Sequence, residues 1–221
     1  MSQELKLRIT TSFILVFILF LTFVSSNFLI ILLLLVSTLS STEFFYLTFK
    51  IFKAKKYFQF ISNIIFVFYT SLFSLFFYMF ALDFGLKILI FFCLISCIFS
   101  DIGGFVFGKF FKGKKLTKLS PNKTISGSIG SFVCVTIFSI FASFFMFGID
   151  MIITLIFVSL LTSLGCQIGD IFFSFLKRKA KIKDTGNLLP GHGGILDRID
   201  GILLGIPFGL FAITLFFLLI S

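Results

Sequence analysis

Three aspartates stand beside long apolar runs of this sequence, at positions Asp170, Asp197 and Asp200. A carboxylate at membrane depth costs about 2.5–3.5 kcal/mol at a helix centre, so it usually faces a cavity and a cationic partner. Asp197 and Asp200 are three residues apart, which places them on one face if a helix begins there. Mg²⁺ prefers oxygen ligands from one or two carboxylates together with substrate phosphates. We therefore interpret the three aspartates as candidate Mg²⁺ ligands.

Basic residues and glycines surround these aspartates in the segment 169–201. The basic side chains are Lys177, Arg178, Lys183 and Arg198, and the glycines are Gly186, Gly191, Gly193 and Gly194. Arginine and lysine neutralise phosphate charge, and glycine lets backbone amides approach a phosphate closely. Acids for a metal and bases for phosphates together predict a nucleotide site. Basic loop residues also follow from membrane topology alone, so a purely structural interpretation stays open for the lysines.

The elements that must position these residues are membrane-spanning helices. The chain of 221 residues is 58% hydrophobic, and its mean hydropathy is +1.17. A run of roughly 18 or more apolar residues is typical of a spanning helix. The apolar runs occupy residues 10–25, 27–48, 58–81, 85–107, 127–147, 151–173 and 201–220. We expect an all-α integral membrane protein, a polytopic bundle of about seven transmembrane helices, and the short first run leaves about six or eight open.

The distribution of positive charge predicts the orientation of these spans. Short loops rich in Lys and Arg stay on the cytoplasmic side of a membrane. With seven spans and a cytoplasmic N-terminus, every Lys and Arg except Lys87 falls on the inner side, which explains the formal net charge of +10. No separate basic face remains to predict nucleic-acid binding. We expect N-terminal transmembrane helices in residues 1–82 and a catalytic transmembrane region in residues 83–221, with cytoplasmic loops at 108–126 and 174–200.

Other conspicuous residue types indicate packing. The cysteines lie inside apolar runs, with neither paired spacing nor a nearby His, so we interpret them as small buried hydrophobic residues. The 39 Phe are spread over every apolar run and are assigned no chemistry. The N-terminal segment has no small-residue cleavage pattern before a soluble domain, and we interpret it as the first span.

The loop after the sixth apolar run carries a pattern specific enough to name. Its residues include Ser174, Lys177, Arg178, Lys183, Asp184, Gly186, Leu189, Pro190, His192, Gly193, Gly194, Asp197, Arg198 and Asp200. The segment resembles the phosphatidate cytidylyltransferase (CDP-diacylglycerol synthase) family pattern S-x-x-K-R-x4-K-D-x-G-x2-L-P-x-H-G-G-x-x-D-R-x-D. Every fixed position of that pattern is filled, so the signal is strong.

Two further segments resemble the same family. The residues Ser100, Asp101, Gly108, Lys109 and 119–130 are similar to S-D … G-[RK] … S-P-x-K-T-x-x-G-S-x-G, and residues 165–170 are similar to G-x-Q-x-G-D. The resemblance runs from about residue 100 to residue 201, with Glu43 and the neighbourhood of Arg8 as weaker echoes. Phe173 and Asn122 depart from the pattern, because the family frequently carries Glu and Lys at these positions.

The resemblance implies an activity and roles for particular residues. The activity is transfer of the cytidylyl group of CTP to phosphatidic acid, which gives CDP-diacylglycerol and pyrophosphate for phospholipid synthesis. The implied catalytic residues are Asp170, Asp197, Lys183, Arg198 and His192, and for His192 a loop-ordering hydrogen bond stays open. The implied substrate-binding residues are Ser120, Lys123, Thr124, Lys177, Arg178, Gly193 and Gly194. The implied metal ligands are Asp170 and Asp197, followed by Asp200 and Asp101.

The resemblance also implies a cofactor, partners and a location. Mg²⁺ is the expected cofactor, and a second cation, divalent or monovalent, stays open. The expected partners are CTP, phosphatidic acid, membrane lipid and a second copy in a homodimer, without nucleic acid. We expect a multi-pass protein of the inner (cytoplasmic) membrane with its active site on the cytoplasmic side. Loops 108–126 and 174–200 are expected to converge on one cavity there.

Two other functions stay open from the residues alone. A CTP-dependent membrane lipid kinase, similar to polyprenol or phytol kinases, would also need Mg²⁺ and basic loops, but it would lack the full H-G-G-x-x-D-R-x-D segment. A small secondary transporter would explain the spans and the aspartates. It would not need Ser-Pro-Asn-Lys-Thr and Gly-His-Gly-Gly segments on one side, and it should show interrupted helices near the bilayer midplane.

Overall fold

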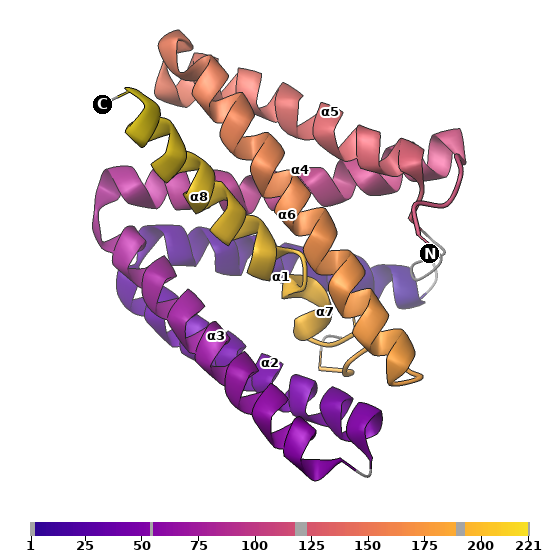
Figure 1. Ribbon diagram of the computed structural model, residues 1–221. Helices are drawn as coiled ribbons and strands as arrows, with labels where there is room; N and C mark the ends of the chain where they lie inside the picture. The colour runs from indigo at the N-terminus through magenta and orange to yellow at the C-terminus, as the bar shows by residue number, and fades with distance from the viewer. Residues whose placement is uncertain (1–2, 54, 118–122, 189–192, 221) are drawn as a thin grey trace. The chain divides into compact units, whose positions relative to one another are not determined.

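The computed structural model describes residues 3–53, 55–117, 123–188 and 193–220, which are almost entirely helical (Figure 1). The helices are α1 (Gln3–Val24), α2 (Ser26–Phe52), α3 (Lys56–Leu82), α4 (Phe84–Phe111), α5 (Ile125–Ala142), α6 (Ile152–Lys179), α7 (Leu196–Ile199) and α8 (Ile202–Ile220). A π-helical turn, η1 (Ser143–Phe147), and a 3₁₀ turn, η2 (Ile149–Met151), connect α5 to α6. No strand occurs among the described residues, and the predicted all-α class is confirmed.

Six helical segments are long and apolar enough to cross a membrane, within the described residues. They are Ser26–Phe52, Lys56–Leu82, Phe84–Phe111, Ile125–Phe147, Ile149–Lys179 and Leu196–Phe216. Each overlaps one of the predicted apolar runs. The apolar part of α1, Thr10–Val24, is shorter, so a seventh span there stays a prediction. The chain is thus a multi-pass membrane protein.

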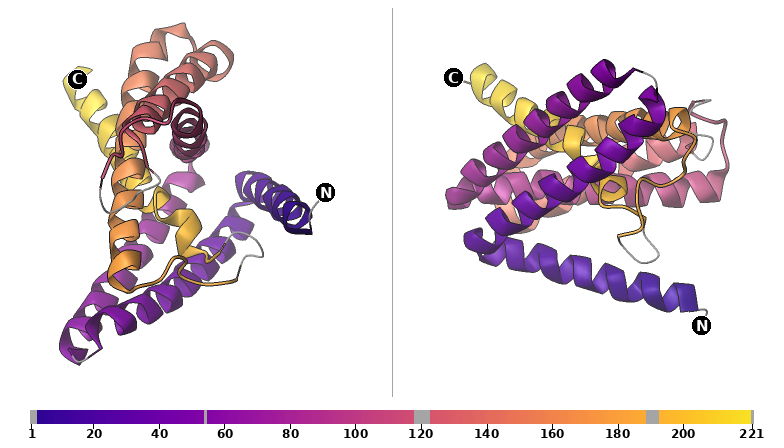
Figure 2. Two further views of the ribbon diagram at one scale, coloured as in Figure 1. Left: turned by 90° about the vertical axis from the view of Figure 1, so that its right-hand side faces the viewer. Right: turned by 90° about the horizontal axis from the view of Figure 1, so that it is seen from below.

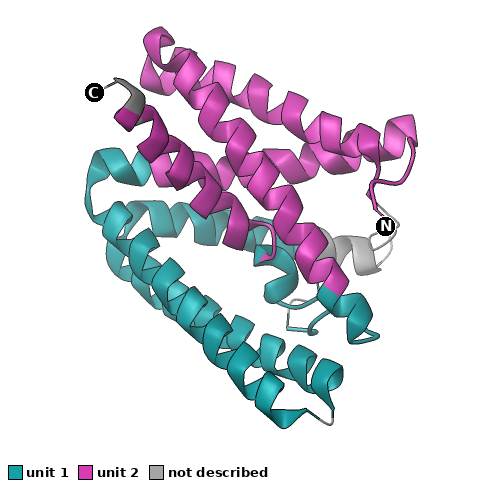
Figure 3. Ribbon diagram, viewed as in Figure 1, with its two compact units in different colours: residues 1–88, 176–199 teal, residues 89–175, 200–221 magenta. Residues whose placement is uncertain are grey.

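The chain divides into two compact units, shown in teal and magenta in Figure 3. Unit 1 comprises residues 1–88 and 176–199, and unit 2 comprises residues 89–175 and 200–221. Each unit has its own internal packing. The boundary predicted between residues 82 and 83 stays a prediction.

Unit 1 is built on the antiparallel pair of α2 and α3, which lie side by side in Figures 1 and 2. Ser25 caps α2 by accepting a hydrogen bond from the Phe28 backbone N–H at 3.3 Å. Between the two helices, the Phe44 and Phe66 rings stack with centroids 4.0 Å apart. The Thr48 hydroxyl donates to the Asn63 side-chain oxygen at 3.1 Å. These contacts between α2 and α3 hold the residues near the C-terminal end of α2 in place.

Unit 2 packs its helices closely through small residues. A Cβ on Gly103 of α4 would lie 2.5 Å from the Gly130 carbonyl oxygen of α5. Buried hydroxyls add hydrogen bonds between helices, with Ser100 to Ser163 at 2.8 Å and Ser139 to Ser159 at 2.7 Å. Small residues and interhelical hydroxyl bonds are typical of helix contacts in lipid, where apolar burial gives little drive for association. The close approach positions the polar residues at the ends of α4, α5 and α6.

Candidate active site

An acidic cluster in unit 2 contains Asp101 of α4 and Cys166 and Asp170 of α6. One ligand atom from each residue lies within 4.8 Å of the others. The Cys166 thiol donates to Asp101 Oδ1 at 3.6 Å, and the four-residue spacing of Cys166 and Asp170 places them on one face of α6. The two carboxylates offer hard oxygen ligands that fit Mg²⁺, whereas a thiol suits softer metals.

Lys123 pairs with the carboxylate of this cluster, since its ammonium donates to Asp170 Oδ2. The side chains are 29% and 19% exposed, so the pair is accessible from outside the unit. An antiparallel bridge between Lys115 and Thr124 places Lys123, and the Leu116 N–H donates to the Lys123 carbonyl at 2.7 Å. The loop thereby fixes a cation beside Asp170. The structure thus brings Lys123 and Asp170, both predicted site residues, into contact.

Thr124 begins α5 as its N-cap. Its hydroxyl accepts from the Gly127 backbone N–H at 3.1 Å and lies 3.0 Å from the Ser126 hydroxyl. The N-terminus of a helix carries a partial positive charge and free N–H groups that favour anions. Lys123 and the start of α5 therefore form a positively polarised region next to Asp170.

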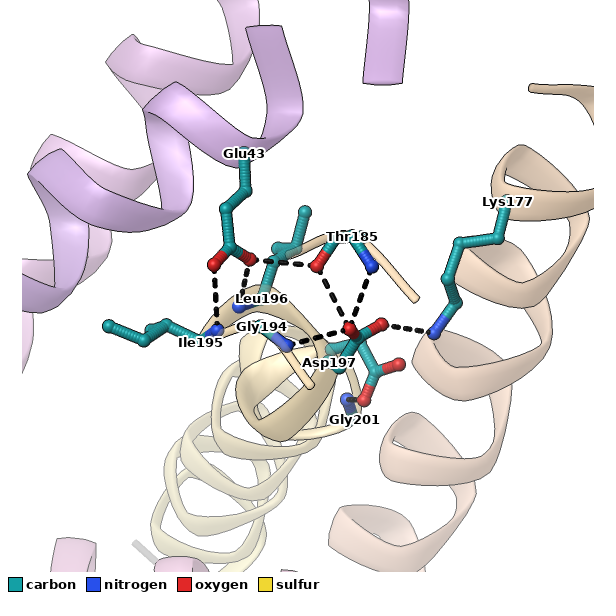
Figure 4. Close-up of polar contacts among 9 residues, drawn as sticks. Glu43, Lys177, Thr185, Gly194, Ile195, Leu196, Asp197 and Gly201 are labelled. Carbon is teal, nitrogen blue, oxygen red and sulfur yellow. Dashed lines mark hydrogen bonds and ion pairs between the residues drawn. The ribbon is translucent and has the colours of Figure 1, made fainter. Parts of the chain in front are cut away.

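Asp197 of α7 is the centre of the polar contacts in unit 1 (Figure 4). Its Oδ1 accepts from the Lys177 ammonium at 2.8 Å. Its Oδ2 accepts from the Thr185 N–H at 2.8 Å, the Thr185 hydroxyl at 3.0 Å and the Gly194 N–H at 3.0 Å. The side chain is only 5% exposed, so these bonds are made in a largely dry environment. Asp197 thus ties the loop that precedes α7 to the last turn of α6.

Glu43 of α2 takes part in the same network and was not a predicted site residue (Figure 4). Its Oε2 accepts from the Thr185 hydroxyl at 2.7 Å and the Leu196 N–H at 2.9 Å, and its Oε1 accepts from the Ile195 N–H at 2.9 Å. The residue is 6% exposed. A sequence signal existed, because Glu43 is the one acid within the apolar run 27–48, and intramembrane carboxylates mark functional sites.

Three glycines of the loop lie so close to the Glu43 or Asp197 carboxylate that a larger residue would not fit without a shift. A Cβ on Gly186 would lie 2.7 Å from Glu43 Oε1, and a Cβ on Gly194 would meet Glu43 and Thr185 Oγ1. Gly193 has φ +84°, a left-handed conformation that favours glycine, and its Cβ would lie 3.0 Å from Asp197 Oδ2. Predicted roles for Gly193 and Gly194 in nucleotide binding stay predictions, and their structural role is to let the loop close around the acids.

The remaining predicted residues have varied positions. Arg178, Lys183 and Arg198 are exposed in unit 1. Asp200, in unit 2, accepts the Gly201 N–H at 3.0 Å through its side chain. Ser120 and His192 lie outside the described residues.

Phe173 and Asn122 are the two positions that depart from the family pattern. Phe173, where the resemblance leads one to expect Glu, is buried within unit 2, with its ring edge-on to Phe172 at 5.3 Å. Asn122 lies outside the described residues. The structure brings Lys177 and Asp197 together in unit 1, and it brings Lys123, Asp101 and Asp170 together in unit 2. A single cavity shared by both loops stays a prediction.

Several known proteins are similar in sequence to this chain. The phosphatidate cytidylyltransferase of Helicobacter pylori strain J99 is 38% identical over 123 residues, which cover 56% of this chain and 46% of that protein. The Rickettsia felis protein of the same name is 41% identical over 127 residues, covering 54% of this chain and 55% of that protein. The Bacillus subtilis one is 38% identical over 138 residues, covering 61% and 50%. The chain spans about half the length of the curated relatives it matches.

A family model extends the similarity beyond these alignments. The model described as the Cytidylyltransferase family matches residues 35–216, a range that includes Glu43 and every predicted site residue. The match therefore covers most of α2, the whole of α3, both loops and the acidic cluster of unit 2. This chain belongs to the Cytidylyltransferase family.

Proposed function

We propose that this chain transfers the cytidylyl group of CTP to phosphatidic acid and releases pyrophosphate. The observation that carries the proposal is the family match over residues 35–216 together with relatives that are named phosphatidate cytidylyltransferase. The chemistry of the residues agrees, since acids suited to a divalent cation and bases suited to phosphates occur in both units. The product is CDP-diacylglycerol, a precursor for phospholipid synthesis.

The reaction asks the protein for positioning and charge neutralisation. A phosphate oxygen of phosphatidic acid attacks the α-phosphorus of CTP, a new P–O bond forms, and the bond to the β-phosphate oxygen breaks as pyrophosphate leaves. Charge on the phosphates must be balanced while the two substrates are held in line. We assign phosphate binding to Lys123 of unit 2 and to Lys177, Arg178, Lys183 and Arg198 of unit 1.

The carboxylates of Asp101 and Asp170 fit a Mg²⁺ ion best, because both lie in one cluster of accessible oxygens. When bound, Mg²⁺ supplies positive charge to the triphosphate. Asp197 would accept a cation through Oδ1 in competition with the Lys177 ammonium. We therefore rank Asp197 of unit 1 second as a ligand of a further divalent or monovalent cation, and we rank Asp200 of unit 2 second by itself as a metal ligand.

Two predicted residues outside the described part of the chain belong to the same proposal. Ser120 would help to shape the nucleotide pocket beside Lys123 and Thr124. His192 would contact phosphate or transfer a proton, or it would order its loop. Turnover of the His192→Asn variant, measured at several pH values, separates the titrating roles from loop ordering. Only loss of a titrating group removes a pH dependence near neutrality.

The location and assembly are proposals of the same kind. The Lys and Arg distribution supports an active site on the cytoplasmic side of the inner membrane. A homodimer is proposed from the family resemblance. Labelling of cysteines introduced at Lys115 and Lys181 tests the orientation, because both must react from the cytoplasmic side only.

A product assay tests the activity. Protein purified in detergent with Mg²⁺ is given radiolabelled CTP and phosphatidic acid, and a second reaction contains polyprenol in place of phosphatidic acid. Lipid-linked CMP with pyrophosphate is the expected result in the first reaction. Free CDP with a phosphorylated polyprenol in the second, and no lipid-linked CMP in the first, would overturn the proposal in favour of a lipid kinase.

A further inference from the structure

Glu43 is a buried carboxylate in an apolar helix, and neither catalysis nor metal binding has been assigned to it. Burying a charged group without partners is costly, so a buried carboxylate needs hydrogen-bond donors that compensate for lost hydration. Glu43 receives them from a chain segment about 140–150 residues away in sequence, at Thr185, Ile195 and Leu196. Donors to a charged acceptor form stronger bonds than neutral pairs do. Glu43 therefore attaches the loop before α7 to the α2–α3 pair.

The loop is shaped to the Glu43 carboxylate. Gly186 and Gly194 approach it so closely that a Cβ at either position would collide with its oxygens. The Ile195 and Leu196 N–H groups point at Glu43 (Figure 4), and Leu196 is the first residue of α7. Asp197 is the next residue along the chain. The orientation of α7, and with it that of Asp197, is thus defined relative to Glu43.

The Thr185 hydroxyl connects the two acids. Its oxygen lies 2.7 Å from Glu43 Oε2 and 3.0 Å from Asp197 Oδ2. A hydroxyl carries a single proton, so the two carboxylates share one donor. Moving either carboxylate alters the hydrogen bonds of the other. Glu43 is consequently coupled to the Lys177–Asp197 ion pair without touching Lys177.

We propose that Glu43 is a positioning residue for cytidylyl transfer: it fixes Thr185, residues 194–196 and Asp197 in the arrangement that binds the nucleotide phosphates. Glu43 acts through Thr185, the loop amides and Asp197, and it does not itself contact substrate. The proposal rests on the proposed function, because Gly193, Gly194 and Asp197 of this segment are assigned to substrate or metal. A simple anchoring role would instead affect only how much of the protein is folded.

Hydrogen exchange tests the local contact independently of activity. Glu43→Gln keeps the side-chain length, but its amide nitrogen must face one of the backbone or hydroxyl donors. The amides of Ile195 and Leu196 are expected to exchange about tenfold faster or more in this variant, in line with loss of a charge-assisted bond. Thr48→Val is the matched control, because Thr48 is buried in the same helix and bonds to Asn63 of α3. Unchanged exchange in Glu43→Gln would overturn the proposal.

Steady-state kinetics separate positioning from anchoring. Glu43→Gln is expected to raise KM for CTP and to lower kcat/KM about tenfold or more, while Thr48→Val keeps wild-type values. A fall in kcat with unchanged KM for CTP, in proportion to the folded fraction, would overturn the proposal. If wild-type protein makes no CDP-diacylglycerol, the proposed function fails, whereas the exchange measurement still reports on the Glu43 contact.

Two other variants keep the test decisive if Glu43→Gln does not insert. Gly194→Ala leaves Glu43 intact but forces the loop away from it, and it should reproduce the raised KM for CTP and the faster exchange. Glu43→Asp keeps the charge and withdraws it by one methylene, so intermediate exchange and kinetics are expected. Wild-type values in both variants would contradict the inference.

Discussion

Asp170 and Asp197 are each paired with a lysine, but their surroundings differ. The Asp170 side chain is 19% exposed and lies with Asp101 and Cys166 in unit 2, where its partner Lys123 is 29% exposed. The Asp197 side chain is 5% exposed in unit 1, and loop donors at Thr185 and Gly194 occupy it together with Lys177. The first arrangement leaves oxygens that a cation can reach. The second uses its oxygens to order a loop. Two aspartates from motifs that resemble the same family are thereby suited to different tasks.

Removal of the accessible carboxylate should have the largest effect. Asp170→Asn removes a negative charge from the acidic cluster, and it removes the carboxylate that pairs with Lys123. We therefore expect turnover to fall about 10²–10³-fold. Product formation is measured over a range of Mg²⁺ concentrations, and the Mg²⁺ needed for half-maximal rate should rise. Asp101→Asn is the companion variant and should shift the same Mg²⁺ dependence. Full turnover with an unchanged Mg²⁺ dependence in Asp170→Asn would remove Asp170 from the proposed metal site.

The Asp197→Asn variant tests the role of the enclosed aspartate in unit 1. The amide would turn a donor toward Lys177 or toward the loop N–H groups, so we expect turnover to fall about 10²-fold in protein that still inserts. Loop ordering predicts that the Mg²⁺ concentration for half-maximal rate stays near the wild-type value. A shift as large as that of Asp170→Asn would make Asp197 a ligand of the same Mg²⁺ ion as Asp170 and would erase the distinction between the two aspartates.

Gly169→Ala tests the packing that supports the acidic cluster. Its Cβ would lie 2.5 Å from the Asp200 carbonyl oxygen, so α6 and the start of α8 must separate. We expect a loss of about 2 kcal/mol in stability, the usual scale of overpacking. Thermal unfolding in detergent measures it. Gly104→Ala is the control, because the nearest atom to its Cβ would be the Ser131 hydroxyl oxygen at 3.0 Å, and it should cost less. Equal losses would show that close backbone contact at Gly169 is not the cause.

Thr124→Ala should have the smallest effect. It removes the N-cap of α5, which costs about 1 kcal/mol, while Thr124→Ser keeps the hydroxyl. Unfolding temperature and KM for CTP are measured together in both variants. A raised KM in Thr124→Ala with unchanged stability would assign the hydroxyl to the substrate and not to the cap.

The predicted site residues differ in how well the sequence could place them. Lys123 and Asp170 carry opposite charges, and both stand in motifs that resemble one family, so their pairing is a natural expectation. Glu43 has charge but no partner that a sequence pattern can reveal. Its donors include the backbone N–H groups of Ile195 and Leu196, and a backbone N–H leaves no mark in the residue type. For the same reason, Gly186 and Gly194 look like phosphate-binding glycines, although each also makes room for Glu43.

The membrane architecture was determined by the sequence itself, because each apolar run is a local property whose length alone matches the thickness of lipid. The likeness to the Cytidylyltransferase family was equally local, since its motifs are contiguous. Only the tertiary structure decided that Asp197 is enclosed by donors while Asp170 stays accessible, and that Glu43 binds a loop far along the chain. Burial and hydrogen bonding depend on which segments meet, and that is set by packing between helices and not by the spacing of residues within them.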